Sequence, residues 1–167
     1  MDEHIIVITP EDEIQTRSFD GLESLRQAVD GNFALVGTKE LMVAADVFDN
    51  ENILIVLYED KDYVRKNYGK GDVKVNALAS SLVGKPVFGK VAFIRDLKDG
   101  NEKGFSTFSP DNNISESEYI CSILRGLIER TKPDLKRLHE IWDNQMPEPV
   151  APIRPLQKRS GSRFSRK

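Results

Sequence analysis

The sequence has few of the residues that most often build metal centres and catalytic nucleophiles. Its 167 residues include one cysteine and two histidines, and His4 and His139 stand near opposite ends of the chain. Transition-metal sites need several such ligands converging on one point, so we expect no metal and no cofactor. The single Cys121 cannot form an internal disulfide, which favours a reducing, cytoplasmic compartment.

Long hydrophobic runs are also missing. The longest uninterrupted apolar stretch, residues 53–58, is far shorter than the about 20 residues that span a bilayer. Because no apolar core follows the acidic start of the chain, we expect no secretory signal and no membrane contact. The glycine-rich phosphate loops and the G-x-S-x-G pattern of hydrolases do not occur either. The sequence therefore predicts a protein that is not an enzyme.

Apolar runs of strand length, separated by turn residues, fill the first hundred positions. Residues 53–58 are apolar throughout, which is typical of a central strand covered on both faces. The polar turn at residues 10–13 lies between the first two runs and predicts a hairpin. The expected strands are residues 4–9, 14–19, 33–36, 41–47, 53–58 and 87–94.

Helices are expected at residues 22–29, after Asn76, and again from Ser115 onward. Ser115 and Glu118 have the spacing of a capping box, and apolar residues then recur at helical intervals until Pro133 interrupts them. We predict an α+β fold, with a mixed, mainly antiparallel sheet and two short helices in residues 1–113. A helical hairpin or a kinked helix follows at 114–144 and packs on the domain or on a partner chain. A disordered, Pro-rich basic tail completes the chain at 145–167.

Charge is distributed unevenly along the chain. The net charge is −3, but from residue 145 onward six cations face one glutamate, which gives the tail +5 and leaves −8 on residues 1–144. The tail combines basic side chains with an aromatic ring, a pattern that permits weak, sequence-independent contact with nucleic acid. A solubilising tail and a segment that docks on a protein partner are the alternatives. The residues concerned are Lys158, Arg159, Arg163, Phe164, Arg166 and Lys167.

Three polar residues are candidates for a binding site in the body of the protein. Asn50, Glu51 and Asn76 offer hydrogen-bond donors and acceptors that can orient a small polar ligand or the backbone of a partner. The alternative is local chemistry, because asparagine also forms turns and caps helices.

The order of these motifs resembles a family of uncharacterised bacterial and phage proteins found on phages, plasmids and conjugative elements. A strand hairpin leads into a short leucine helix ending in glycine, here residues 22–31. An Asn-Glu turn, an Asn-x-x-Ala helix and an apolar-x-Gly strand follow, here at Asn50, Asn76 and Val87. The resemblance covers about residues 4–95 and implies a small α+β domain on a mobile element, with no reaction attached. The charged residues 59–72 and everything after Ile114 depart from it.

We therefore expect a non-catalytic accessory protein of a phage or other mobile element, acting in the cytoplasm of a bacterial host. Its partner is a protein encoded by the host or the element, and its apolar helix face allows a homodimer. One alternative is an accessory factor that holds nucleic acid with its basic tail. The other is a module that sequesters a nucleotide or another small ligand at Asn50, Glu51 and Asn76.

Overall fold

The computed structural model describes residues 2–67, 74–97 and 102–143. The strands are β1 (Glu3–Ile8), β2 (Ile14–Ser18), β3 (Phe33–Gly37), β4 (Ile53–Tyr58), β5 (Val91–Asp96), β6 (Glu102–Lys103) and β7 (Phe105–Ser106). The α-helices are α1 (Leu22–Val29), α2 (Met42–Val47), α3 (Lys61–Asn67), α4 (Ala77–Val83), α5 (Glu116–Thr131) and α6 (Leu135–Asp143). Two 3₁₀ turns occupy Thr38–Glu40 and Lys132–Asp134.

The strands form one sheet in the order β2-β1-β5-β4-β3, with β6 added to β5 and β7 added to β1. Every pair of named strands is antiparallel. The predicted α+β class with a mainly antiparallel sheet is thus confirmed. The hairpin of β1 and β2 and the buried interior strand β4 are confirmed as well.

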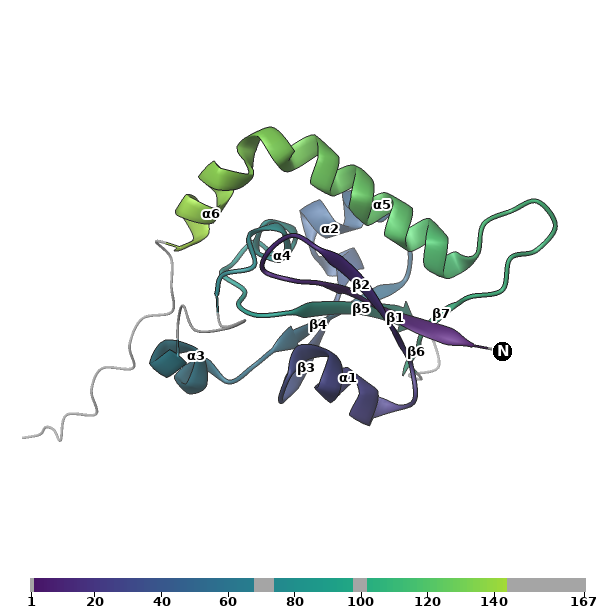
Figure 1. Ribbon diagram of the computed structural model, residues 1–167, viewed down its shortest axis with the longest axis horizontal. Helices are drawn as coiled ribbons and strands as arrows, with labels where there is room; N and C mark the ends of the chain where they lie inside the picture. Colours follow the sequence, from purple (N-terminus) through teal and green to yellow (C-terminus); the bar gives the residue numbers. More distant parts are fainter. Residues whose placement is uncertain (1, 68–73, 98–101, 144–167) are drawn as a thin grey trace, which may run out of the picture.

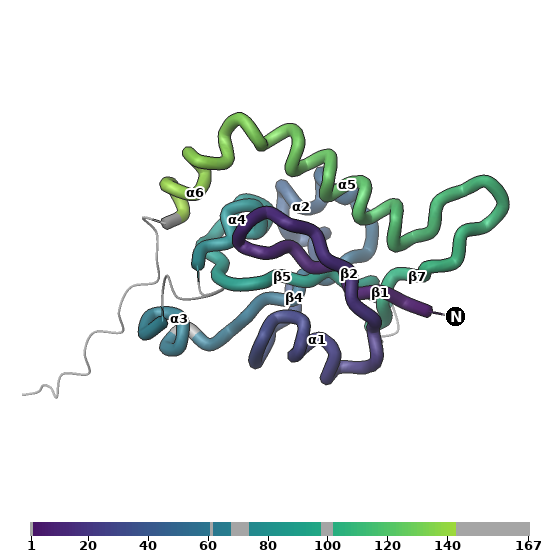
Figure 2. The backbone as a smooth tube through the Cα atoms, viewed as in Figure 1, coloured from purple at the N-terminus to yellow at the C-terminus, as the bar shows by residue number. Residues whose placement is uncertain are grey.

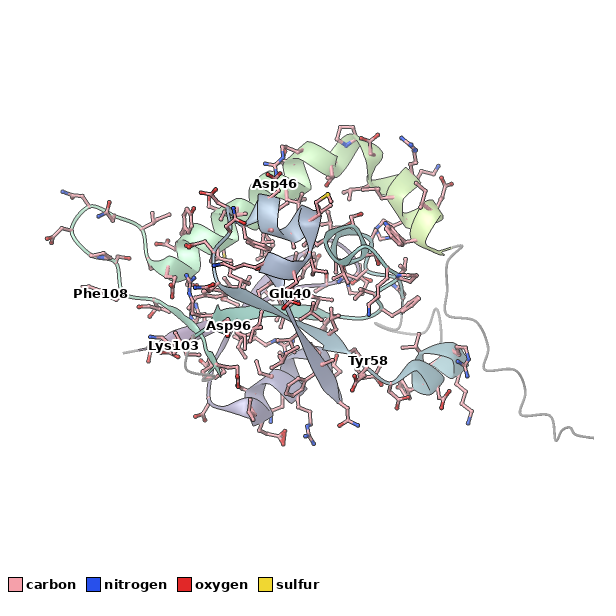
Figure 3. The ribbon with its side chains drawn as sticks, turned by 180° about the vertical axis from the view of Figure 1, so that it is seen from behind. Glu40, Asp46, Tyr58, Asp96, Lys103 and Phe108 are labelled. Carbon is pink, nitrogen blue, oxygen red and sulfur yellow. The ribbon has the colours of Figure 1, made fainter. Side chains whose placement is uncertain are left out.

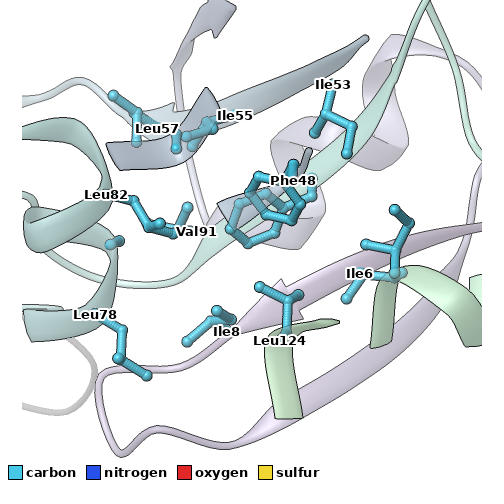
Figure 4. Packing of buried hydrophobic residues seen from close by; sticks show 14 of the residues in the cluster. Ile6, Ile8, Phe48, Ile53, Ile55, Leu57, Leu78, Leu82, Val91 and Leu124 are labelled. Carbon is cyan, nitrogen blue, oxygen red and sulfur yellow. The ribbon is translucent and has the colours of Figure 1, made fainter. Parts of the chain in front are cut away.

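Helices cover the sheet on both faces (Figure 1). On one face, α1 buries Leu25, Ala28 and Val29 against alternate side chains of β1, β4 and β5. On the other face, α2, α4 and α5 share a larger core, in which Phe48 and Leu124 lie among the strand side chains (Figure 4). Because β4 and β5 contribute to both cores, their apolar residues are continuous rather than alternating.

The prediction of a strand at residues 41–47 is wrong, because most of this segment is helix α2. A short apolar run does not distinguish a strand from a buried helix. Here Ala44 and Phe48, four positions apart, are both buried, whereas Met42 and Val43 are exposed. This is helical spacing, and alanine and methionine favour it.

The predicted strand at residues 87–94 begins later than expected, at Val91. Val87 and Phe88 precede it in an arch, where Phe88 forms an isolated bridge with Val75. Gly89 has a φ of 78°, a conformation that favours glycine and turns the chain into β5. Gly89 therefore ends the arch rather than interrupting a strand.

The C-terminal helices follow one another along one side of the sheet (Figure 2). Ser115 and Glu118 form the predicted capping box at the start of α5. At Lys132–Asp134 the chain passes through one 3₁₀ turn that contains Pro133 and then continues as α6. The predicted helical hairpin is therefore wrong, and the structure has the alternative form, a kinked helix, because α6 continues from α5 through this single turn. The predicted tail, 145–167, lies outside the described residues.

Candidate functional site

Asn76 is one of the three candidate binding residues, and its side chain is fully used within the fold. The residue is 0% exposed. Its Nδ2 donates hydrogen bonds to Ile8 O at 3.1 Å and Gly89 O at 3.0 Å, and its Oδ1 accepts one from Ala79 N at 3.2 Å. Asn76 thus caps α4, as predicted, and ties that helix to β1 and to the arch. It presents no group to a ligand.

Asn50 and Glu51 lie elsewhere, at the end of α2. Asn50 is exposed and has a φ of 60°, which a turn asparagine tolerates. It borders an open hollow of about 540 Å³ whose other lining residues all come from α2. The carboxylate of Glu51 lies 4.0 Å from the guanidinium of Arg95. Neither residue shares a hydrogen-bond partner with Asn76, so these contacts do not join the three in one polar site.

Arg95 connects the end of the sheet to the start of α5. It is paired with Glu116, whose other oxygen accepts a hydrogen bond from Ser106 N at 3.1 Å. Its guanidinium also lies 5.5 Å from the centre of the Phe105 ring. With every charged group in this cluster paired, the arrangement holds α5 in place and offers no reactive group.

Residues 2–67, 74–97 and 102–143 offer little support for a metal site, a nucleophilic cysteine or a membrane-spanning helix. No group of three or more His, Cys, Asp or Glu side chains there is arranged to hold a metal ion. Cys121 is buried, and this burial raises the pKa of its thiol, which disfavours the nucleophilic thiolate. None of the described helices has the length and hydrophobicity to cross a bilayer.

A groove lies where β3 and β4 meet α3 and the arch before β5. Its volume is about 200 Å³. The apolar lining comes from the two strands, from α3 and from the arch, and consists of Ala34, Val36, Leu57, Val64, Pro86, Val87 and Phe88. Tyr58, Glu59, Asp60 and Lys85 complete the lining with polar groups. The groove thus brings together apolar and polar side chains from four separate segments of the chain.

The polar side of the groove is biased towards negative charge. Glu59 and Asp60 are both exposed, and they face the single ammonium of Lys85. Burial, and then the carboxylates of Asp60 and Asp30, raise the pKa of Tyr58. The raised pKa favours the protonated Tyr58 hydroxyl. This neutral group can donate a hydrogen bond in the groove lining, to which Glu59 and Asp60 also belong.

Strand β3 is the last strand of the sheet, and in the described part of the chain it pairs only with β4. Just before β3, Glu59 N donates to Asn32 O at 2.9 Å, so these two residues form a hydrogen-bonded pair. Bonded and non-bonded pairs alternate along an antiparallel ladder. Counting from Asn32, Ala34 and Val36 therefore bond to β4, and the backbone groups between them face outwards.

The outward-facing groups belong to Phe33, Leu35 and Gly37, each with one N–H and one C=O. Such an edge is a template for another extended chain. Because side chains alternate between the faces of a strand, Ala34 and Val36 line the groove while Leu35, 38% exposed, lies on the other face. An added strand would place every second side chain over the groove. In Figure 3, Glu40 marks the segment just after β3, and Tyr58 marks the end of β4.

No family model, curated protein or solved structure matches the chain. The resemblance to phage and plasmid proteins stays a prediction. The nucleic-acid residues predicted in the tail, from Lys158 to Lys167, lie outside the described residues.

The sequence reasoning did not find the groove or the β3 edge. Residues 33–36 were expected to form a strand, but their pattern does not say that the strand is at an edge. A usable signal was the acidic pair Glu59 and Asp60 directly after the most apolar strand, since the end of a buried strand often borders a binding site.

Proposed function

We propose that this protein binds an extended segment of another protein along β3, with one side chain of that segment in the groove. The observation that carries the proposal is the outward-facing backbone of Phe33, Leu35 and Gly37 beside a pocket lined by Ala34 and Val36. Strand addition of this kind takes its affinity from backbone hydrogen bonds and its specificity from pockets for alternate side chains.

The size of the groove favours a single side chain over a free small molecule. Pockets for drug-sized ligands have volumes of about 300–1,000 Å³, and this groove has about 200 Å³. The alternative of a nucleotide-sequestering module is weakened on other grounds, because the open hollow beside Asn50 is lined only by α2 and Asn50 itself, and Asn76 is buried.

The charges indicate what the bound segment looks like. Apolar side chains such as Val64 and Phe88 suit an aliphatic group, and Glu59 and Asp60 suit a cation next to it. Residues i and i+2 of a strand lie on the same face. The expected ligand is therefore an extended peptide with an aliphatic residue and a lysine or arginine two positions apart.

The biological setting rests on the sequence resemblance alone. We infer a non-catalytic accessory protein of a phage or other mobile element, in the cytoplasm of a bacterial host, whose partner is encoded by the host or the element. The nucleic-acid alternative rests on the six cations of the tail. It predicts binding that falls steeply with salt and does not involve β3.

The test is selection from a displayed library of random twelve-residue peptides, followed by affinity measurements with synthetic copies of the selected peptides. Two variants of one position separate strand addition from other modes. Leu35→Pro removes an N–H that faces away from β4, so edge pairing is lost while the sheet is kept. Leu35→Thr keeps the N–H and β propensity. We expect about a tenfold or greater loss of affinity for the first and little change for the second.

The acidic side of the groove has its own pair of variants. Asp60 Oδ1 accepts a hydrogen bond from Tyr63 N at the start of α3, so Glu59 is the better residue to change. Glu59→Gln should weaken binding of a basic peptide at low salt and have no effect at high salt. Glu40→Gln, equally exposed but outside the groove lining, is the control. Equal affinity of the wild type and Leu35→Pro for every selected peptide, or no selected peptide at all, would refute the proposal.

A further inference from the structure

The described chain ends beside the groove. Trp142, in the last turn of α6, packs in a cluster with Val64, Phe88 and Tyr58, and these three residues also line the groove. The Trp142 indole Nε1 donates a hydrogen bond to Ser81 Oγ at 3.1 Å, which fixes the end of α6 on α4. Any segment that follows residue 143 therefore starts at the wall of the groove.

The sequence of the tail has the features expected of the ligand. Leu156 is aliphatic, Lys158 follows two positions later, and Leu156 begins the proline-free part of the tail. Pro149, Pro152 and Pro155 precede it, so the earlier residues are poor partners for a sheet edge. The net charge of the tail, +5, complements the −8 of the rest of the chain.

We propose that the chain's own segment 156–160 occupies the β3 edge, with Leu156 in the groove and Lys158 beside Glu59 and Asp60. This inference rests on the proposed function, since it assigns the first occupant of the same edge. It makes the tail a built-in competitor that a protein partner must displace.

The register follows from the position of the charges. β3 runs from Phe33 to Gly37, and its first residues lie beside the end of β4 that leads into Glu59. Placing Lys158 opposite Ala34 and Leu156 opposite Val36 gives an antiparallel pair with the cation at the acidic end. The tail would then extend the antiparallel sheet by one strand, on the side of β3 opposite to β4.

The connection between α6 and Leu156 is long enough to reach along β3. The chain between Asp143 and Leu156 spans about 40 Å when extended, whereas five-residue β3 is only about 17 Å long. A second apolar-x-cation pair, Phe164 and Arg166, lies farther along the tail. It would close a longer loop at a greater entropy cost and would place a larger ring in the small groove.

Amide hydrogen exchange of the full-length protein, followed by NMR, tests the inference. The amides of Leu35 and Gly37 face away from β4, so without an occupant they exchange quickly, whereas those of Ala34 and Val36 are protected by β4. In the wild type we expect all four to be protected. Leu156→Ser with Lys158→Glu should speed exchange at Leu35 and Gly37 by about tenfold or more and leave Ala34 and Val36 unchanged, which also shows that the sheet is intact.

The matched control is Phe164→Ser with Arg166→Glu, which changes the same kinds of residue and the same charge outside the docking segment. It should exchange like the wild type. The inference is overturned if Leu35 and Gly37 exchange equally fast in all three proteins, or equally slowly in all three. It is also overturned if the control variant alone loses protection, or if protection rises with protein concentration and so comes from a second copy.

The same experiment separates this inference from the proposed function. If the tail does not dock but the edge is a binding site, the amides of Leu35 and Gly37 exchange quickly in the wild type by itself. They become protected when a peptide selected from the displayed library is added. If no peptide protects them, the edge itself is not a binding site, and both proposals fail. If the tail docks, the selected peptide should bind the Leu156→Ser, Lys158→Glu variant more tightly than the wild type.

Discussion

Replacing Asn76 by alanine should destabilise the protein strongly. The side chain donates to Ile8 O and Gly89 O and accepts from Ala79 N. It is completely buried, so water cannot readily take over the buried hydrogen bonds to Ile8 O and Ala79 N. The substitution therefore leaves two carbonyl groups without this donor and removes the N-cap of α4.

The expected loss can be estimated bond by bond. A buried polar group left without a partner costs about 1–3 kcal/mol. We assign about 2 kcal/mol to the buried bond to Ile8 O and about 1 kcal/mol to the part-buried bond to Gly89 O. Loss of an N-cap costs about 1 kcal/mol more. The total, about 4 kcal/mol, is a large part of the about 5–15 kcal/mol by which a native protein is stable.

Urea denaturation followed by the fluorescence of Trp142, the single tryptophan, measures this loss. With a slope of about 2 kcal/mol per M, the midpoint should fall by about 2 M at unchanged slope. Asn50→Ala is the control: Asn50 is exposed, so only the strain of alanine at its φ of 60°, about 1 kcal/mol, is expected. A loss below about 1 kcal/mol for Asn76→Ala would show that these buried bonds do not stabilise the fold as argued.

This outcome also decides how a small-ligand site is tested. A thermal shift caused by a nucleotide and abolished in Asn76→Ala would reflect an unstable protein as readily as a lost contact. Asn50→Ala and Glu51→Gln are the informative variants, because Asn50 is exposed and Glu51 is only partly buried. A shift that survives in both would contradict a role for these residues.

Three further predictions concern single residues. Ser115→Ala removes the capping box of α5 and should lower the free energy of unfolding by about 1 kcal/mol in the same urea assay; an unchanged midpoint would contradict it. Gly104→Ala places a methyl group 2.7 Å from Phe19 Cβ and 2.9 Å from His4 O and should cost about 1–3 kcal/mol, whereas Gly84→Ala meets no atom within 4 Å and only its positive φ opposes it. Cys121 should react with iodoacetamide only after unfolding, because burial raises the pKa of its thiol. The protonated Cys121 thiol contributes its full stability below the ordinary thiol pKa of about 9. This contribution is lost as pH rises above that value, because the thiol of the unfolded chain releases its proton at a lower pH than the buried thiol.

Local signals predicted most of the elements correctly. β1, β2 and β4 follow from apolar runs and turn residues, and the caps at Asn76 and Ser115 form the hydrogen bonds expected of them. The error at α2 came from a run too short to show its period. Its burial at Ala44 and Phe48 is visible only once the core is assembled.

The candidate site could not be derived in the same way. Its groove combines Val36 from β3 with Val64 from α3 and Phe88 from the arch, and no pattern in the sequence links these segments. The predicted site residues were chosen for their chemistry instead. Asn76 shows the limit of that choice, because the amide that can bind a ligand is also the amide that can hold three segments of a fold together.

The sequence by itself determined where most strands and helices lie, α2 and the start of β5 excepted, because capping, turns and side-chain alternation depend on residues a few positions apart. Only the tertiary structure decided the order of the strands. Residues 33–37 have the same pattern whether their strand is central or at an edge, and β3 is last because β4 pairs with β5 on its other side. The outward-facing backbone of Leu35, and with it the proposed function, follows from contacts between segments distant in the chain.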